Sequence, residues 1–332
     1  MQAYQEGSDL MDRRGCKSFV LGIDVGGTSV KCGLFEDSGT LLARVSTPTG
    51  ELVSPLGIER AINACEQLVR DNQLGSQDIV GVGLDVPGPV DERGKVGMLA
   101  NIKLDMAALT EALSKAFPLA LLSCINDANA AALGELWQGA ARGLSSAVLV
   151  TLGTGVGGGV VVDGHMVAGA FGAGGEIGHI TVNRDETRVC GCGRKGCLEQ
   201  YASAKGMVHT YRELCKEAEV EPMALQGPTD TYTIFKAARE GDAYATGAID
   251  KMADTLAFAF AQISCVVDPE VFLIGGGVAA GFDLFEERLV KAFVRYCLPP
   301  CTHTRIVAAR LGNDAGIYGC AYQVLCEANK LV

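Results

Sequence analysis

The sequence contains one local pattern twice. Residues 19–35 and residues 147–162 each combine a buried apolar strand, a turn rich in glycine and a return strand. Short apolar runs that end at glycine are typical of buried strands joined by tight turns. The same hairpin at two distant points predicts a chain built from two related halves that face one another.

Helical patterns alternate with further apolar runs. Apolar residues recur with helical spacing between 56 and 74, and Gly75 follows as a stop signal. Strands that alternate with helices predict the α/β class. The other predicted helices span 128–137, 249–267, 284–296 and 314–326, and the other predicted strands span 41–45, 79–84, 119–125 and 271–274.

The length of the chain favours two lobes. A chain of 332 residues is long enough for two lobes with a core each. We expect a disordered tail over residues 1–17 and a smaller N-terminal lobe made of 18–137 and 312–332. A larger C-terminal lobe would span 138–311.

The charge balance limits the kinds of partner. The sequence has 28 Lys and Arg against 39 Asp and Glu, a net charge of -11. An acidic protein binds nucleic acid and anionic membranes poorly, so we expect neither as a partner. Residues 1–17 lack the apolar core of a signal peptide, and the uncharged run 144–162 holds five glycines, which favours a strand pair over a membrane helix. We therefore expect a cytoplasmic protein.

One histidine and three cysteines with metal-ligand spacing lie close together in the sequence, namely His179, Cys190, Cys192 and Cys197. Three thiolates and an imidazole complete the tetrahedral shell of zinc, and a closed shell leaves no place for a reactive water. We therefore predict a structural Zn²⁺. The alternatives are free thiols that act as small buried hydrophobes and a disulfide framework, which an odd count of 13 cysteines and a reducing cytosol disfavour.

Three acidic residues are candidates for binding a polar ligand or a metal ion. Glu176 and Glu199 lie beside the two ends of the cysteine and histidine cluster, where they would be fixed as hydrogen-bond acceptors for a polar ligand. The alternative for Glu199 is an ordinary surface residue. Asp24 ends the first predicted strand and is a candidate for holding Mg²⁺ through water, or for capping the turn that follows.

Three glycine-rich turns follow predicted strands. Backbone amides can approach phosphate oxygens where no Cβ intrudes, and open α/β sheets bind ligands at strand ends. Each turn alone could be a plain hairpin, and none has Walker A or dinucleotide spacing. Together they predict a nucleotide site formed by Asp24, Gly26, Gly27, Thr28, Gly153, Thr154, Gly155, Gly275, Gly276 and Gly277.

Five motifs occur together in this chain. They are Asp24-Val-Gly-Gly-Thr28, Asn126-Asp127-Ala-Asn-Ala-Ala-Ala-Leu-Gly-Glu135, the stretch from Leu149 to Gly175-Glu-Ile-Gly-His179, the three cysteines up to Glu199, and Gly275-Gly-Gly277. In this combination the chain, from about Phe19 to its C-terminus, resembles the ROK family (repressors, open reading frames, sugar kinases) of the actin/hexokinase ATPase superfamily.

The resemblance implies both a fold and an activity. The implied fold is a two-lobed, actin-like ATPase (ribonuclease H-like) α/β fold with a central cleft and a structural zinc loop. The implied activity is that of an ATP-dependent kinase that uses Mg²⁺ and acts on a hexose hydroxyl. Family members are commonly homo-oligomers, so the resemblance also implies a dimer or tetramer.

The resemblance also assigns roles to residues. Asp127 would be the general base for the sugar 6-hydroxyl, and a carboxylate at a strand end can take that proton as attack proceeds. The alternative role of Asp127 is to cap the helix that follows. The implied sugar contacts are Gly88, Asn101, Asn126, Asp127, Glu176, His179 and Glu199, with His179 using its other ring nitrogen on zinc.

We expect the substrate to be glucose and the product to be glucose 6-phosphate. Many family glucokinases place a tryptophan shortly after the residue that matches Asn101, and this chain does not. A kinase for mannose, fructose, N-acetylglucosamine or N-acetylmannosamine is therefore the main alternative. A sugar-responsive regulator of the family is another, but few residues precede the first hairpin, too few for its DNA-binding domain. Asp24 and Asp127 argue against a third alternative, a non-catalytic sugar-binding protein.

Overall fold

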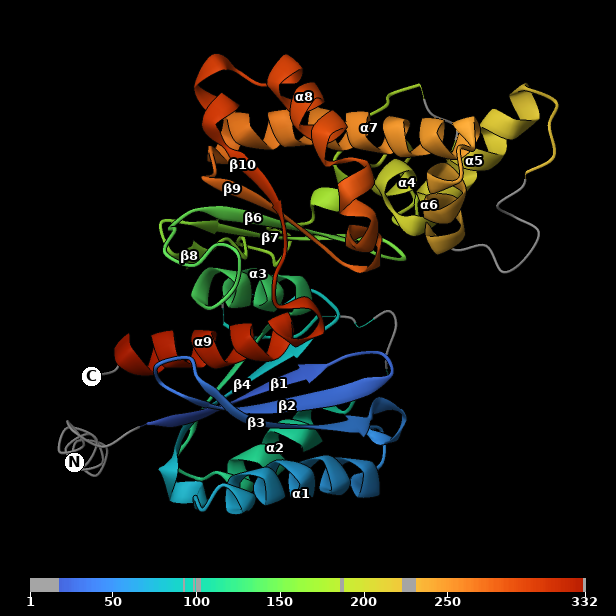
Figure 1. Cartoon of the computed structure of the whole chain (residues 1–332). Helices are drawn as coiled ribbons and strands as arrows, with labels where there is room; N and C mark the ends of the chain where they lie inside the picture. The colour runs from blue at the N-terminus through green and yellow to red at the C-terminus, as the bar shows by residue number, and fades with distance from the viewer. Residues whose placement is uncertain are drawn as a thin grey trace. The chain divides into compact units, whose positions relative to one another are not determined.

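The computed structural model of the chain describes residues 18–91, 93–97, 99, 103–185, 188–222 and 231–330. The chain divides into two compact units, each with one mixed five-stranded sheet (Figure 1). The predicted α/β class is confirmed, while the predicted tail lies outside the described residues. The first unit comprises Met1–Gly139, Ala168–Ala173 and Asn313–Val332, and the second comprises Ala140–Val167 and Gly174–Gly312.

The sheet of the first unit has the order β3-β2-β1-β4-β5. The first three strands form an antiparallel meander, and β4 and β5 run parallel to β1. The carboxyl ends of β1, β4 and β5 therefore lie along one edge of the sheet. The bounds are β1 Phe19–Val25, β2 Ser29–Glu36, β3 Leu41–Pro48, β4 Ile79–Val86 and β5 Leu121–Asn126.

Helices cover both faces of this sheet. In Figure 1, α1 (Pro55–Asp71) and α2 (Met106–Ala116) lie on one face, and α3 (Asp127–Trp137) and α9 (Ala315–Lys330) lie on the other. The helix predicted over 56–74 begins one residue earlier, where the hydroxyl of Ser54 accepts a hydrogen bond from Gly57 N. The sequence pattern did not predict α2.

Helix α9 packs directly on the backbone of the sheet. A Cβ at Gly22 would lie 1.9 Å from the carbonyl oxygen of Ile317, and a Cβ at Gly83 would lie 2.0 Å from that of Cys320. Only glycine permits such an approach. This close packing brings the first turn of α9 next to the ends of β1 and β4.

The sheet of the second unit has the order β10-β9-β6-β7-β8. Strands β6, β9 and β10 are parallel, and β6 and β7 form the second predicted hairpin. The bounds are β6 Ala147–Leu152, β7 Val156–Val162, β8 His165–Met166, β9 Val271–Gly275 and β10 Arg305–Ala308.

The long helix α7 lies at the centre of the second unit. It starts at Ala243 rather than 249, because the Asp242 carboxylate accepts hydrogen bonds from the amides of Tyr244 and Ala245. Phe260 of α7 stacks on Phe272 of β9 with ring centroids 4.2 Å apart. The helices of this unit are α4 Glu199–Ala202, α5 Ala204–Glu217, α6 Thr231–Arg239, α7 Ala243–Val267 and α8 Glu286–Tyr296, besides short 3-10 turns such as η4 Ile177–His179 and η6 Gly277–Leu284.

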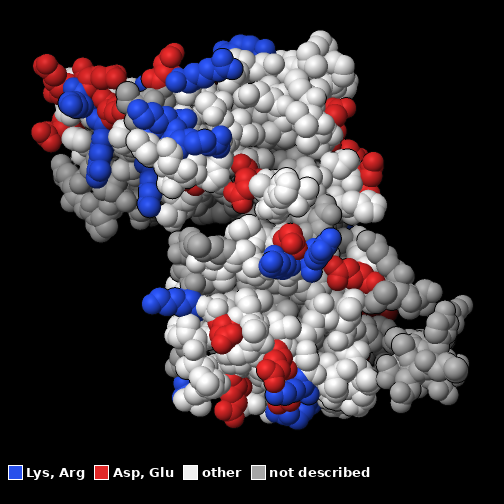
Figure 2. Space-filling view, turned by 180° about the vertical axis from the view of Figure 1, so that it is seen from behind, with Lys and Arg blue, Asp and Glu red and all other residues white. Residues whose placement is uncertain are grey.

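The helices and the surface charge can be compared with the expectations about membranes and nucleic acid. In the part of the chain that the structure describes, the helices are too short or too polar to cross a membrane. On the face drawn in Figure 2, acidic and basic side chains lie beside one another.

Candidate active site and metal centre

Polar residues gather at the carboxyl edge of the first sheet. Asp24 at the end of β1 is paired in register with Asp85 of β4, and Val86 is paired with Asn126 at the end of β5. Asp127 follows at once as the first residue of α3. Ligands of α/β sheets bind at this edge, so the topology brings together residues that are far apart in the sequence.

Asn126, not Asp127, caps α3. The side-chain oxygen of Asn126 accepts hydrogen bonds from Ala128 N at 3.0 Å and Asn129 N at 3.1 Å. The alternative role given to Asp127, that of the cap, thus belongs to Asn126, although the Asp127 carboxylate also accepts a hydrogen bond from Ala128 N at 2.9 Å. Asp127 occupies the first helical turn, where a negative charge interacts favourably with the helix dipole, and it is exposed.

The turn after β4 is hydrogen-bonded to the start of α3. The side-chain amide of Asn126 donates a hydrogen bond to the carbonyl oxygen of Gly88 at 3.0 Å. Further along the turn, the Asp91 carboxylate accepts hydrogen bonds from Arg93 N at 2.9 Å and Lys95 N at 3.0 Å, which fixes its shape. The structure thus places predicted sugar contacts Gly88 and Asn126 together, whereas Asn101 lies outside the described residues.

The first glycine turn leaves its backbone accessible. A Cβ at Gly27 would meet no atom within 4 Å, so open space lies beside this peptide. Thr49 holds the turn, because its hydroxyl donates to the carbonyl oxygen of Gly26 at 2.6 Å and its amide donates to that of Thr28 at 3.1 Å. A fixed turn with exposed amides fits phosphate oxygens.

Asp24 has a charged neighbour that the sequence pattern did not indicate. The Lys31 ammonium donates to the Asp24 carboxylate at 2.8 Å and to the carbonyl oxygen of Asn313 at 2.9 Å. The side chain of Asp24 is 16% exposed. A carboxylate at this edge offers the oxygen ligands that Mg²⁺ prefers. In this structure the same carboxylate is also paired with the Lys31 ammonium.

Asp85 is a site residue that the sequence interpretation missed. It is fully buried, one carboxyl oxygen lies 3.2 Å from the Cys320 sulfur, and the other has no hydrogen-bond partner. Burial raises the pKa of Asp85 well above its usual range, and the charges of Asp24 and Asp127 raise it further. The sequence feature that could have identified Asp85 is an acidic residue inside the apolar run 79–86. Asp is rarely buried without a partner, so an aspartate in a buried strand indicates a special role.

In the second unit, two of the predicted nucleotide loops lie side by side. Thr151 of β6 pairs with Gly275 of β9, so 153–155 and 276–277 emerge at the same edge of the sheet. Gly276 has φ +81°, and a Cβ there would lie 2.4 Å from the carbonyl oxygen of Leu152. Open space lies beside Gly153 and Gly277. Two adjacent loops with accessible backbone fit a phosphate group and its nucleoside.

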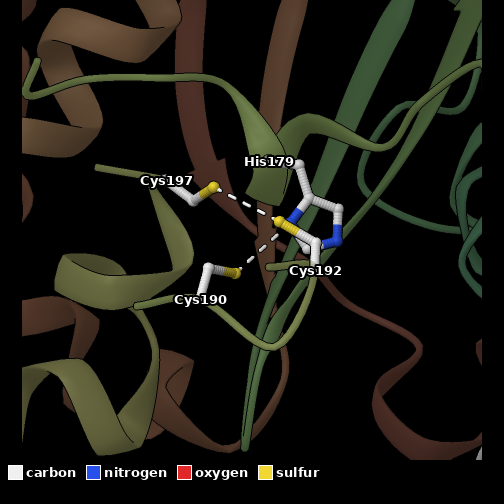
Figure 3. A group of neighbouring side chains, drawn as sticks. All are labelled: His179, Cys190, Cys192 and Cys197. Carbon is white, nitrogen blue, oxygen red and sulfur yellow. Dashed lines mark hydrogen bonds between the residues drawn. The ribbon is translucent and has the colours of Figure 1, made fainter. Parts of the chain in front are cut away.

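The four predicted zinc ligands converge. Their ligand atoms all lie within 4.8 Å of one another, and Figure 3 shows the side chains of His179, Cys190, Cys192 and Cys197 pointing inward. The Cys192 and Cys197 sulfurs are 3.7 Å apart, as are the Cys190 sulfur and His179 Nδ1. Two sulfurs bound to one tetrahedral zinc would be about 3.8 Å apart, given a zinc–sulfur bond of about 2.3 Å.

The same geometry argues against a disulfide, and the exposure of Cys192 argues against a small buried hydrophobe at that position. The Cys192–Cys197 separation is far above the roughly 2.05 Å of a disulfide, and Cys192 is exposed rather than a small buried hydrophobe. The backbone amide of Arg194 lowers the pKa of Cys192 to about 6, whereas burial raises the pKa of Cys197 to about 12. A cation is the group that would hold both as thiolates, so the donor set fits Zn²⁺.

Three of the predicted sugar contacts lie in or beside the cluster of His179 and the three cysteines. His179 turns Nδ1 toward the thiols, and its Nε2 lies 3.9 Å from the Glu176 carboxylate. One oxygen of Glu199 accepts a hydrogen bond from Val156 N at 3.1 Å, and the other lies 3.6 Å from the Cys190 sulfur. Glu199 is thus half-buried and held, not an ordinary surface residue.

Relatives of the chain are sugar kinases by name. A glucokinase of Halalkalibacterium halodurans is 35% identical, covering 94% of this chain and 96% of its own. A glucokinase of Thermotoga maritima is 36% identical, covering 91% and 96%. An N-acetyl-D-glucosamine kinase of Photobacterium profundum is 32% identical, covering 91% and 97%.

Solved structures agree with these relatives. A ROK hexokinase from Thermus thermophilus matches with a TM-score of 0.80 and 33% identity, covering 94% of this chain and 99% of its own. A ROK glucokinase from Streptomyces griseus, solved with glucose and AMPPNP, matches with a TM-score of 0.71 and 30% identity, covering 92% and 98%. A family model described as ROK family matches residues 20–327. The chain belongs to the ROK family.

Proposed function

We propose that the chain transfers the γ-phosphoryl group of ATP to the 6-hydroxyl of glucose and forms glucose 6-phosphate. The observation that carries the proposal is the position of Asp127. Its carboxylate is exposed at the first residue of α3, beside Asn126, which is fixed to the Gly88 turn. The relatives named glucokinase supply the substrate class.

Asp127 acts as the general base in this proposal. A sugar hydroxyl is a poor nucleophile at neutral pH, and a nearby carboxylate takes its proton as it attacks the phosphorus. The amides of Gly27 and Thr28 and those of Thr154 and Gly155 hold phosphate oxygens in this proposal, and 275–277 border the nucleoside. The amides of Gly26 and Gly153 instead shape the turns, because they donate to the carbonyl oxygens of Ser29 and Gly155. Mg²⁺ would neutralise charge on the phosphates, and Asp24 would orient it through water.

The proposed sugar contacts offer mainly polar groups. Hydroxyl groups of a hexose offer donors, so carboxylate and amide oxygens suit them. His179, Cys190, Cys192 and Cys197 would hold Zn²⁺ in this proposal, and the bound ion would have a structural role, because it would fix His179 and the segment that leads to Glu199. We propose as sugar contacts Gly88, Asn101, Asn126, Asp127, Glu176, His179 and Glu199.

A second candidate is a kinase of N-acetylglucosamine. It is favoured by the relative of that name and by the absence of a tryptophan shortly after Asn101. A site that pairs each ring hydroxyl rejects sugars in which one is missing or inverted, and a site with room at carbon 2 accepts an acetamido group. The two candidates share the reaction and differ in the sugar.

A coupled assay of ATP consumption tests both candidates. The purified chain is supplied with Mg²⁺, ATP and, in turn, glucose, mannose, fructose, N-acetylglucosamine or N-acetylmannosamine. We expect the highest kcat/KM with glucose. A preference of about tenfold for an N-acetylated sugar would replace the first candidate with the second. No sugar-dependent ADP formation with any of the five would overturn both.

A further inference from the structure

An exposed phenylalanine lies in a glycine-rich segment of the first unit. Phe171 is 94% exposed, the most exposed of the large hydrophobic side chains that the structure describes. Gly169, Gly172 and Gly175 around it have φ of +78°, +72° and +84°. Glycines in this conformation make the backbone turn sharply on both sides of Phe171, and such positions can absorb the rotation of a short segment.

The segment is packed against the turn that carries Gly88. Ala168–Ala173 belong to the first unit, although the residues on both sides belong to the second. A Cβ at Gly172 would lie 3.3 Å from the carbonyl oxygen of Val90, so the backbone next to Phe171 touches this turn. Asn126 is hydrogen-bonded to the same turn through Gly88. Within one unit, the backbone next to Phe171 therefore lies against the turn to which Asn126, the neighbour of Asp127, is hydrogen-bonded.

We infer that Phe171 contacts the bound hexose and determines which sugar is accepted, by packing its ring against the C–H face of the pyranose. This inference rests on the proposed function. The C–H face of a hexose is apolar, and covering it with an aromatic ring removes apolar surface from water on both partners. The polar residues of the site read the hydroxyl groups, and none of the proposed sugar contacts has an apolar side chain that would cover this face.

Kinetics of three variants test the contact. Phe171→Ala should lower kcat/KM for glucose by roughly tenfold or more, mainly through KM, which is the size expected for one lost apolar contact. Phe171→Tyr should restore most of it. Tyr232→Ala is the matched control, because Tyr232 is 71% exposed on α6 and lies far along the chain from the site residues. An unchanged KM in Phe171→Ala would overturn the inference.

A spectroscopic variant gives a readout that does not depend on turnover. Trp137 is the one tryptophan of the chain, so the double variant Trp137→Phe, Phe171→Trp reports on position 171 alone. Saturating glucose should shift the emission to shorter wavelength, because the indole leaves water. Glucose that binds by calorimetry without changing the emission would overturn the inference. If no hexose binds or is phosphorylated by the unmodified chain, it is the proposed function that fails.

Discussion

The side-chain amide of Asn126 donates a hydrogen bond to the carbonyl oxygen of Gly88 at 3.0 Å, while the oxygen of the same amide caps α3. One side chain therefore connects the turn after β4 with the start of the helix that carries Asp127. The position of the proposed base depends on this link.

Two variants of Asn126 separate its two roles. Asn126→Asp keeps a capping oxygen but loses the donor to Gly88, so we expect near-normal melting and a kcat lower by about tenfold to a hundredfold, the range that misplacement of a reacting group produces. Asn126→Ala also loses the cap and should unfold more easily by about 1 kcal/mol. Thermal melts and steady-state kinetics measure both. Equal kcat in Asn126→Asp and the unmodified chain would mean that the link to Gly88 has no catalytic value.

Asp127→Asn removes the proposed proton acceptor and preserves the shape of the side chain. We expect kcat to fall by about 10²–10⁴-fold, the usual contribution of a general base. Sugar affinity measured by calorimetry should change little, since an amide still pairs with a hydroxyl. Folding should be unaffected, because the cap is Asn126. A kcat close to normal would leave positioning and charge stabilisation as the mechanism.

Metal analysis tests the zinc centre. We expect about one zinc per chain, and stripping it should lower both the melting temperature and the activity. Cys192→Ser removes one exposed ligand and should have the same effect. Cys265→Ser is the matched control, because Cys265 is an exposed cysteine on α7 outside the cluster. A preparation that is fully active without metal would contradict the structural role.

Asp85 predicts a pH dependence of stability. Its folded-state pKa is raised, so the folded chain keeps a proton that the unfolded chain releases near pH 4. The stability from Asp85 is thus fully present below the unfolded pKa and is lost as pH rises through the folded pKa. Asp85→Asn mimics the neutral acid and should flatten this fall. Urea unfolding between pH 4 and 8, without Mg²⁺ or nucleotide, measures it.

Asp91 gives a comparison of opposite sign. The backbone amides of Lys95 and Arg93 lower the pKa of its carboxyl, so its contribution is present above the unfolded pKa and is lost as pH falls. Asp91→Asn should therefore leave the decline toward high pH in place. If Asp91→Asn flattened that decline as much as Asp85→Asn does, the assignment to Asp85 would be wrong.

Local patterns in the sequence predicted much of the site. The two glycine hairpins and the cysteine and histidine cluster are short-range signals, and the structure brings the four ligands together. Helices α2, α5 and α6 were not predicted. In particular, α5 (Ala204–Glu217) and α6 (Thr231–Arg239) lie outside all the helices that the sequence pattern predicts.

The remaining features depend on contacts between distant parts of the chain. Asp85 joins the site only because β4 lies beside β1 in register and Cys320 of α9 packs over it. The side-chain amide of Asn126 caps α3 and also donates to the carbonyl oxygen of Gly88. The adjacent polar residues Asn126 and Asp127 do not reveal in the sequence which of them makes these contacts. Pairing and packing of this kind have no signature in the spacing of residues along one segment.

The contact of α9 with Gly22 and Gly83 has a consequence for how the chain is made. Along the chain, the strands of the first unit precede the second unit, and the helix that packs on their glycine-lined face follows it. Until α9 is made, Val20 and Phe35, fully buried in the finished protein, are covered on that side only in part, by residues such as Trp137 of α3. The first unit therefore completes its folding only once α9 has been made, and a chain truncated before α9 would present an apolar surface to the chaperones and proteases of the cell.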